Sequence, residues 1–533
     1  VEHDARNSLM QLGYLSRLFW GEVHLVLPKF ICRKYRLPMS ARPRFEPTPC
    51  IGPTDNPTLG ESWTPLISAP ADFPPDIFEA ATAQLVHHPE YNSTLILRSE
   101  LIEETVSNFP LLVPVFKAAD LQPVRNIHRR LLPRRPGRDE PLDQHCTFYG
   151  SQTAPNTLIL TPVVPDSSAM PYYHPPVSHL AFRYLKTSPP TLRVEVVLLS
   201  SNVPIDPNSR LYRTALALLD TVHRYGWGTA TNYQKRVNHD RVVPREAYQD
   251  LYLVMREKFK GMVDTWAEST DPLKHVFEDI GIATFLILLW KDTFPSVEEG
   301  SSLNEPWKGW GRPPSGFLDF GCGNGLLTHI LVSCGYPGFG VDLRARVSWE
   351  AYPAETRAHL RVGAFTPDVL HISSPENPFA SPPGVFIIAN HADELTPWTP
   401  LLATRVGASG FLNIPCCPWA FDAKFERGKA TAGFKAPLED ADLSEVFNLG
   451  PEGNTSAYGK YRTWIGQLSQ HCGWDVECEM LRIPSTRNWA LIGRKRFENR
   501  SQAATNVDAI TQVVGDRGLF KARKPEGKAG RGH

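Results

Sequence analysis

The chain has 533 residues, enough for two or three domains, and its 56 Lys and Arg residues balance its 56 Asp and Glu residues. This balance excludes a general positive field around the protein, so any basic surface for nucleic acid must be local. No two of the nine cysteines have C-x-x-C spacing, which argues against a disulfide framework and fits a reduced compartment. The longest apolar run, residues 280–290, is too short to cross a bilayer. We therefore expect no membrane anchor and a cytoplasmic location.

The first region, residues 1–124, is rich in proline and shows no recognisable chemistry, so we expect it to be poorly defined. Residues 125–293 are predicted to form a second, mixed domain that contains strands and helices. The expected elements of this domain are strands at 157–164 and 192–200 and helices from about 211, over 245–268, and from Asp271-Pro272 to Lys291.

One basic run lies inside this second domain. Residues 125–138 hold six arginines and no acidic residue. Such a run is either a contact for nucleic-acid phosphates or a solvated face. The same alternatives hold for Lys235-Arg236 with His239.

A linker rich in Pro, Gly, Ser and Glu, residues 294–315, precedes a region in which strands alternate with helices, residues 316–497. This alternation predicts a parallel sheet. The five expected strands lie at 317–320, 338–342, 360–365, 384–390 and 408–417. A helix is expected at 456–472, and a closing antiparallel pair of strands at 474–483 and 488–496. Over residues 494–533 ten Lys or Arg residues outnumber four Asp or Glu residues, so we expect residues 498–533 to be a basic, disordered tail.

The most informative stretch runs from Phe317 to Asp342. A short buried strand carrying Asp319 enters a glycine-rich turn, an apolar helix follows, and a second strand ends on Asp342. This pattern predicts a nucleotide-binding βαβ unit, because glycines let the backbone approach a ligand and the second acid can accept hydrogen bonds from a ribose. The turn has the spacing G-x-G-x-G, with Leu326 where a dinucleotide fingerprint has its third glycine. The candidate cofactor-binding residues are Asp319, Gly321, Gly323, Asn324, Gly325, Asp342 and Asn390.

A polar cluster, residues 390–398, follows the fourth strand of this region. Ligands of open α/β sheets lie at the carboxyl ends of the strands, so we expect this cluster to face a substrate. The alternative is that Asn390 and Asp393 cap the next helix while Glu394 is solvated, but capping explains one acid and not the whole cluster. The candidate catalytic residues are Asp393, His391, Glu394 and Lys424, with Lys291 as an alternative cation.

Two further groups near this region have competing explanations. Cys416-Cys417 with His471-Cys472 could be considered metal ligands, but their spacing matches no zinc pattern, and we expect no metal. The aromatic side chains Trp398, Trp419 and Phe421 could stack on a base, although such residues more often belong to a core.

The G-x-G-x-G turn, with Asp319 before it and Asp342 after it, resembles motif I of class I methyltransferases. The resemblance implies a Rossmann-like α/β methyltransferase sheet in the C-terminal half, residues 316–497, preceded by a mixed, helix-containing N-terminal region. It also implies S-adenosyl-L-methionine as the cofactor, with its methionine part near Asp319 and its ribose hydroxyls on Asp342.

Longer motifs narrow this resemblance, and they lie at 173–175, 180–182, 233–240, 243–252, 271–280, 390–398 and 481–488. Over about residues 125–496 the chain resembles the eukaryotic tRNA (uracil-2′-O-)-methyltransferase family, which acts on the uridine at position 44 of serine tRNA. The resemblance implies 2′-O-methylation of a uridine ribose, with serine tRNA as the partner. The alternative is a methyltransferase that acts on another RNA position, a protein or a small molecule.

A ribose 2′-hydroxyl is a poor nucleophile, so its proton needs an acceptor during methyl transfer. We expect Asp393, with His391 or Glu394, to orient or deprotonate this hydroxyl. We expect Lys424 or Lys291 to offset the negative charge that develops on the oxygen.

Overall fold

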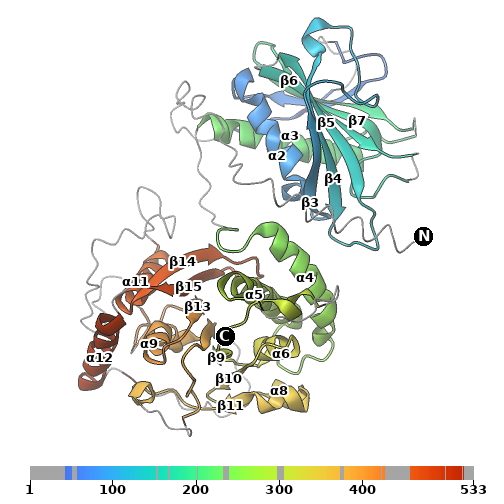
Figure 1. Cartoon of the computed structure of the whole chain (residues 1–533). Helices are drawn as coiled ribbons and strands as arrows, with labels where there is room; N and C mark the ends of the chain where they lie inside the picture. Colours follow the sequence, from blue (N-terminus) through green and yellow to red (C-terminus); the bar gives the residue numbers. More distant parts are fainter. Residues whose placement is uncertain are drawn as a thin grey trace. The chain divides into compact units, whose positions relative to one another are not determined.

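The computed structural model describes residues 43–50, 57–151, 154–165, 169–200, 202–231, 239–296, 305–371, 377–421, 423–425, 456–497, 500–518 and 520. The chain divides into two compact units, Val1–Gln234 and Lys235–His533, and each unit has a sheet of its own (Figure 1).

The N-terminal unit is built on an eight-stranded sheet in which every pairing is antiparallel. The strand order is β1-β2-β8-β7-β6-β5-β4-β3, so the strands from β3 to β8 form a meander in which consecutive strands are neighbours. The strands are β1 (Thr48–Pro49), β2 (Thr64–Pro70), β3 (Ile96–Thr105), β4 (Pro123–Pro133), β5 (Leu142–Ser151), β6 (Ala154–Val163), β7 (Val177–Leu185) and β8 (Thr191–Leu198). Short 3-10 turns are η3 (Pro75–Ile77), η4 (Pro89–Tyr91) and η5 (Ala119–Leu121).

Alternation of side chains along the strands gives this sheet two different faces. Residues such as Phe148 and Leu158 pack into a core with α2 (Phe78–His87) and α3 (Arg210–Ala230), which lie along the sheet in Figure 1. The helix α3 begins after Ser209, whose hydroxyl accepts a hydrogen bond from the backbone N–H three residues on. The helix predicted from about residue 211 is therefore confirmed.

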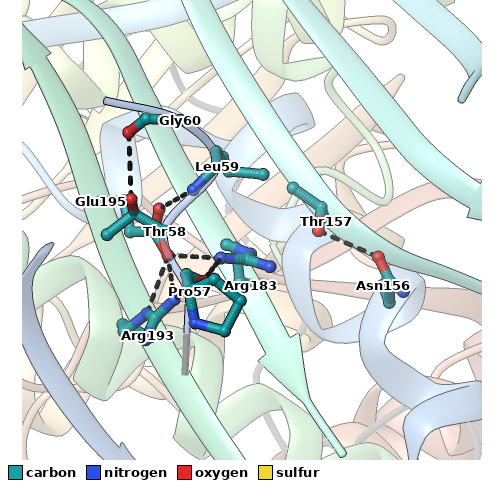
Figure 2. Close-up of polar contacts among 9 residues, drawn as sticks. All are labelled: Pro57, Thr58, Leu59, Gly60, Asn156, Thr157, Arg183, Arg193 and Glu195. Carbon is teal, nitrogen blue, oxygen red and sulfur yellow. Dashed lines mark hydrogen bonds and ion pairs between the residues drawn. The ribbon is translucent and has the colours of Figure 1, made fainter. Parts of the chain in front are cut away.

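The opposite face of this sheet carries a buried ionic cluster centred on Glu195 (Figure 2). The Glu195 carboxylate pairs with Arg193 at 2.5 Å and with Arg183 at 2.7 Å, and it accepts the Leu59 N–H at 2.9 Å. Both guanidinium groups also donate to the Pro57 carbonyl, at 2.8 and 3.0 Å. The cluster thus fastens the chain before β2 onto β7 and β8.

The C-terminal unit is built on a seven-stranded sheet of order β11-β10-β9-β12-β13-β15-β14. The strands from β9 to β13 pair in parallel, and β14 and β15 add an antiparallel pair beside β13. The predicted parallel sheet with an antiparallel end is therefore present. The strands are β9 (Phe317–Phe320), β10 (Gly338–Asp342), β11 (Leu360–Val362), β12 (Phe386–Asn390), β13 (Gly410–Ile414), β14 (Trp474–Met480) and β15 (Trp489–Arg496).

Helices cover both faces of this sheet and enclose two hydrophobic cores. In Figure 1, α4 (Arg245–Phe259), α5 (Pro272–Thr293) and α6 (Leu326–Ser333) lie on one side of the sheet. The other core is formed with α9 (Trp398–Arg405), α11 (Ala457–His471) and α12 (Arg500–Asp516). The shorter helices are α7 (Val347–Ala351), α8 (Ala354–Ala358), η7 (Lys260–Val263), η8 (Pro306–Gly309), η9 (Pro367–His371) and η10 (Asp393–Leu395).

The long helix α5 lies at the centre of the first core. It begins at Pro272 after Asp271, whose carboxylate accepts the Leu273 N–H at 3.0 Å, as the sequence predicted. Its second half is buried, and Trp290 packs against Phe317 of β9 with ring centroids 6.2 Å apart. This packing holds the C-terminal end of α5 at the amino ends of the central strands, since Phe317 is the first residue of β9.

The domain boundaries predicted from the sequence require correction. The predicted division at residue 124/125 falls inside β4. It is not a domain boundary, because the strands before it and after it belong to one sheet. The predicted domain 125–293 is also divided, since α4 and α5 belong to the C-terminal unit. The N-terminal unit is mostly strand rather than mixed, and the described part of the predicted linker 294–315 buries Trp307 fully in the core with α5.

The predicted disordered tail, residues 498–533, also requires correction over its first half. Residues 500–516 form α12, and Val507, Ile510 and Val514 are buried in the second core. Residues 521–533 lie outside the described part of the chain, as do Lys235-Arg236.

Among the residues that the structure describes, no helix has both the length and the apolarity needed to cross a membrane.

Candidate active site

The glycine-rich turn between β9 and α6 requires glycine at three positions. Gly321, Gly323 and Gly325 have φ angles of 86°, 54° and 77°, in the left-handed region that side chains with a Cβ rarely adopt. Asn324 accepts the Leu326 N–H through its side-chain oxygen at 2.8 Å and so helps α6 to begin. The turn at the carboxyl end of β9 therefore has a backbone conformation that favours glycine, as its sequence predicted.

Asp342, the last residue of β10, braces this turn. One carboxylate oxygen accepts the Gly323 N–H at 2.9 Å, and the other faces the Arg344 N–H at 3.4 Å. The indole of Trp349 donates to the Gly323 carbonyl at 2.9 Å from the other side. The strand–turn–strand unit thus places a carboxylate beside the turn, where a ribose would meet it.

Asp319 is buried at the end of β9 beneath the turn. The Thr328 hydroxyl of α6 donates to one of its oxygens at 2.8 Å, whereas the other oxygen has no hydrogen-bond partner among the described residues. Burial raises the pKa of Asp319 to about 7, against the opposing effect of the Thr328 hydrogen bond. A buried acceptor of this kind suits a ligand that carries hydrogen-bond donors or positive charge.

A second buried acid, Asp279, reaches this place from α5. The Asn390 amide at the end of β12 donates to Asp279 at 3.3 Å, and the Asn390 oxygen has no partner among the described residues. Burial, together with the charges of Asp319 and Glu278, raises the pKa of Asp279 well above its ordinary value. Sequence analysis assigns no role to Glu278 or Asp279, two adjacent acids that directly precede the apolar run 280–290 of α5.

The polar loop after β12 begins with two residues in the left-handed region. His391 and Asp393 have φ angles of 52° and 45°. The His391 ring lies 2.9 Å from the Glu278 carboxylate of α5, and Asp393 accepts a hydrogen bond from the Cys416 thiol at 3.7 Å. The capping alternative for Asn390 and Asp393 is wrong, because neither η10 nor α9 has a side-chain cap at its first turn.

Asp393 gathers with Cys416 and Cys417, and their donor atoms lie within 4.8 Å of one another. Burial, and then the neighbouring thiol and Asp393, raise the pKa of Cys416, and burial followed by Asp393 does the same for Cys417. The thiols are therefore neutral at physiological pH and act as weak hydrogen-bond donors to Asp393. The pair His471-Cys472 considered with them lies instead at the end of α11, where Cys472 is fully buried.

The two candidate lysines differ from the sequence expectation. Lys291 lies at the last turn of α5, about 18 Å along the helix axis from Asp279 at the standard rise per residue, and its ammonium group lies 3.9 Å from the centroid of the Trp310 ring. It is therefore too far from the loop after β12 to act there. Lys424 is exposed beyond β13, and no contact described in the structure joins it to Asp393.

The aromatic side chains after the strands are mainly core. Trp398 and Phe421 are 1% and 3% exposed and lie edge to face with ring centroids 4.9 Å apart. They cannot stack on a base without leaving that core, so the core alternative is confirmed for both. Trp419 is half-buried.

The arginines at 125–138 lie along β4 and in the turn that follows it. Arg129 is buried and donates to Gln144 at 3.0 Å, Arg130 is paired with Asp143 at 2.6 Å, and Arg125 is paired with Glu79. The acids that the run itself lacks are thus supplied by neighbouring elements. Exposed side chains of this run are Arg134, Arg135 and Arg138.

These features together define a class of protein. A glycine turn, a carboxylate at the end of the second strand and buried unpartnered acceptors suit a ribose-containing cofactor with a cationic group. The family model described as "Predicted AdoMet-dependent methyltransferase" matches residues 242–367, which include α5, the turn and Asp342. The C-terminal unit therefore carries an S-adenosyl-L-methionine-dependent methyltransferase domain, and the cofactor predicted from the sequence is confirmed.

The N-terminal unit and the full length narrow the class further. The model "TRM44-like, N-terminal bet v1-like domain" matches residues 39–236. Three relatives are called tRNA (uracil-O(2)-)-methyltransferase. The Schizosaccharomyces pombe protein is 34% identical to this chain, and the alignment covers 86% of this chain and 91% of the relative. The Neurospora crassa protein is 36% identical (coverage 81% and 87%), and the Saccharomyces cerevisiae protein is 30% identical (coverage 87% and 92%). The chain belongs to the tRNA (uracil-O(2)-)-methyltransferase family. No solved structure matched it.

Proposed function

We propose that this protein transfers a methyl group from S-adenosyl-L-methionine to the ribose 2′-oxygen of a uridine in tRNA, and that this uridine is position 44 of serine tRNA. The observation that carries the proposal is the joint match of both units to one family of tRNA methyltransferases. The choice of serine tRNA and position 44 is supported by the motif resemblance alone.

The C-terminal sheet is proposed to be a Rossmann-like class I methyltransferase sheet. Counting from β9, its parallel strands follow the order 3-2-1-4-5, which is the order of doubly wound nucleotide-binding sheets. Ligands of such sheets bind where the strand order reverses, here between β9 and β12. Asp319 and Asn390 lie at those two strand ends, which supports their assignment to the cofactor.

The cofactor would supply a methyl group on a positively charged sulfur. Asp342 would hold its ribose hydroxyls, because this carboxylate lies at the end of β10 beside the glycine-rich turn. The unpartnered oxygens of Asp319 and Asn390 would accept donors from its methionine part. These side chains would orient the cofactor, and orientation of two reactants can lower a barrier by several kcal/mol.

The acceptor hydroxyl is proposed to meet the loop after β12. Here His391, Asp393 and Glu394 follow directly on Asn390, so they lie next to the proposed cofactor position in the chain. One of these groups would take the proton of the 2′-hydroxyl, a role worth roughly 10² to 10⁴ in rate. Lys424 remains a proposal for charge compensation, whereas Lys291 is excluded by its place on α5.

The tRNA contact is proposed to include exposed arginines of the N-terminal unit. Arg135 and Arg138 are exposed in the turn after β4 and free of the strand pairings that hold Arg125 and Arg130. Replacing both by Gln should reduce the slope of tRNA affinity against salt concentration by roughly two. An unchanged slope would exclude this turn from the contact.

The direct test is transfer of a labelled methyl group to defined acceptors. Serine tRNA, the same tRNA with cytidine at position 44, an unrelated tRNA and a reaction without RNA would be compared. The proposal expects label in serine tRNA only, and loss of label when position 44 is changed. Label in the unrelated tRNA would move the site elsewhere in RNA, and label without RNA would indicate a protein or small-molecule acceptor.

A further inference from the structure

We propose that Glu278 of α5 is a positioning residue that holds His391 as the general base for the 2′-hydroxyl. This inference rests on the proposed function and identifies which group of the loop after β12 takes the proton. The Nε2 atom of His391 lies 2.9 Å from a Glu278 oxygen. The two residues are 113 positions apart in sequence, so only the packing of α5 against the end of β12 joins them.

Glu278 has the properties of a fixed anion. Its side chain is only 3% exposed, so its carboxylate cannot exchange the His391 contact for solvent. Burial by itself would raise the pKa of Glu278, but hydrogen bonds from His391 and Ser485 and the charges of His391 and Lys274 outweigh it and hold the pKa below its ordinary value. The carboxylate is therefore ionised at physiological pH.

His391 has the properties of a base that this anion would support. When Nε2–H donates to Glu278, Nδ1 is left with its lone pair, and Nδ1 has no hydrogen-bond partner among the described residues. The His391 side chain is 34% exposed, so a substrate hydroxyl can reach it. A carboxylate that fixes the tautomer of a histidine and stabilises its protonated form is the arrangement that general-base histidines use.

Other charged groups around the pair are compatible with this role. From α5, His275 lies close enough to interact electrostatically with both members, and Asp279 interacts with Glu278. Asp393 in the same loop is turned toward the thiol of Cys416, with which it is hydrogen-bonded. The remaining neighbours are Lys274 beside Glu278 and Arg487 beside Cys417. None of these groups replaces Glu278 as the hydrogen-bond partner of His391 in the described structure.

The proton and electrons balance in this step. The 2′-oxygen forms a bond to the methyl carbon while the carbon–sulfur bond of the donor breaks and leaves its electron pair on sulfur. The hydroxyl proton passes to Nδ1 of His391, and the exposed imidazolium later returns it to water. Asp393 would then orient the hydroxyl rather than deprotonate it.

The test uses the full-length protein, tRNA and S-adenosyl-L-methionine. Four variants are compared: Glu278→Gln, which keeps the shape and removes the charge; His391→Gly, which suits the left-handed backbone at this position; the double variant; and Glu257→Gln, an exposed matched control on α4. Each is measured for cofactor Kd, for kcat and for the pH dependence of kcat.

We expect Glu278→Gln to lower kcat by about 10- to 100-fold with an unchanged cofactor Kd, because a hydrogen bond to a charged group is lost. The pH dependence of kcat should also change in Glu278→Gln, because the charge that faces the general base is removed. His391→Gly should lower kcat by about 10² to 10⁴, with partial recovery on adding imidazole. The double variant should be no slower than His391→Gly.

Three outcomes would overturn the inference. The first is a Glu278→Gln variant with the rate and pH profile of the wild type. The second is a double variant in which the two losses of kcat multiply as independent effects. The third is a His391→Gly variant that binds the cofactor fully but recovers no activity on adding imidazole. A wild-type protein that methylates no tRNA would instead contradict the proposed function itself, so the two failures are distinguishable.

Discussion

The carboxyl of Asp319 combines full burial with one oxygen that no described group satisfies. Because burial raises its pKa to about 7, the Asp319 carboxyl is only partly ionised at pH 7. This is a cost that a cationic ligand would relieve, since positive charge beside the carboxyl favours its ionised form. If Asp319 binds the cofactor as proposed, cofactor binding should therefore be accompanied by proton release.

The first prediction concerns the pH dependence of stability at Asp319. A folded-state pKa near 7, above the ordinary value of 3.8, means that the folded protein keeps a proton that the unfolded chain loses. The contribution of Asp319 to the free energy of unfolding should therefore be fully present below about pH 4. This contribution should fall by up to about 4 kcal/mol as pH rises to about 7. Asp319→Asn should remove this part of the fall. Hydrogen exchange of β9 and β12 amides at several pH values measures it, and an identical pH slope in the variant would contradict it.

The second prediction concerns Asp342. Asp342→Asn keeps an oxygen to accept the Gly323 N–H but removes the charge that would hold the cofactor ribose. Loss of a charged hydrogen bond costs about 1.5–3 kcal/mol, so the cofactor Kd should rise about 10- to 100-fold. Calorimetric titration measures the Kd. The exposed Asp475→Asn on β14 is the matched control, and equal Kd values for both variants would show that Asp342 does not bind the ribose.

At the residue scale, the turn could be predicted and the acids of α5 could not. Three glycines and two acids at fixed spacing identify the βαβ unit locally, because the spacing itself carries the geometry. Glu278 and Asp279 reach the site only through contacts with residues 113 and 111 positions away, to which no local pattern points.

At the scale of elements, α12 extends the second core beyond the last strand. Val507, Ile510 and Val514 recur at helical spacing and are buried, whereas Val513 is 37% exposed on the same helix. This stripe was present in the sequence, but the excess of basic residues favoured a disordered tail. The excess of Lys and Arg was counted over residues 494–533, which extend beyond both ends of α12. This count therefore concealed the helical spacing of the apolar residues within α12.

The third prediction tests this packing. Val507→Ala should lower the free energy of unfolding of the C-terminal unit by about 1–3 kcal/mol, because it removes buried methyl groups and leaves a cavity. Val513→Ala should change it by no more than about 0.5 kcal/mol, since its side chain is partly exposed. Denaturant titration measures both. Equal effects of the two substitutions would mean that α12 does not pack on α9 in solution.

The fourth prediction concerns the sheet of the N-terminal unit. Glu195→Gln leaves the Arg183 and Arg193 guanidinium groups beside a neutral side chain in a buried cluster. Removing one member of a buried ionic group costs about 3–5 kcal/mol, so the thermal midpoint of this unit should fall by several degrees. Glu100→Gln, which breaks the half-exposed pair with Arg98, should have almost no effect. A fall of the same size in both variants would contradict a structural role for the cluster.

The strands of the N-terminal unit were only partly predictable, for a physical reason. Strands β6 and β8 show apolar runs, but β4 and β5 bury Asn126, Arg129, Gln144 and Thr147. Asn126 accepts the Thr147 hydroxyl at 2.9 Å, and Arg129 donates to Gln144, so each polar group finds its partner across the strands. Sequence alternation cannot identify such strands, because their buried positions are polar.

At the scale of the whole molecule, two units with different sheets share one chain without net charge. The C-terminal unit holds the proposed cofactor and acceptor groups, and the N-terminal unit carries exposed arginines after β4. A neutral protein that binds tRNA must do so through local basic surfaces, so its tRNA affinity should depend on salt through a small number of contacts.

The central claim is methyl transfer to a uridine 2′-oxygen in tRNA. The most direct measurement is mass spectrometry of nucleosides from serine tRNA after reaction with a donor that carries a deuterated methyl group. The account predicts 2′-O-methyluridine that carries the deuterated methyl, formed by the wild-type protein and strongly reduced in His391→Gly. A deuterated methyl on the base of a nucleoside, or no labelled nucleoside in the tRNA, would contradict it, whereas labelled 2′-O-methyluridine that forms equally well in His391→Gly would contradict only the role of His391.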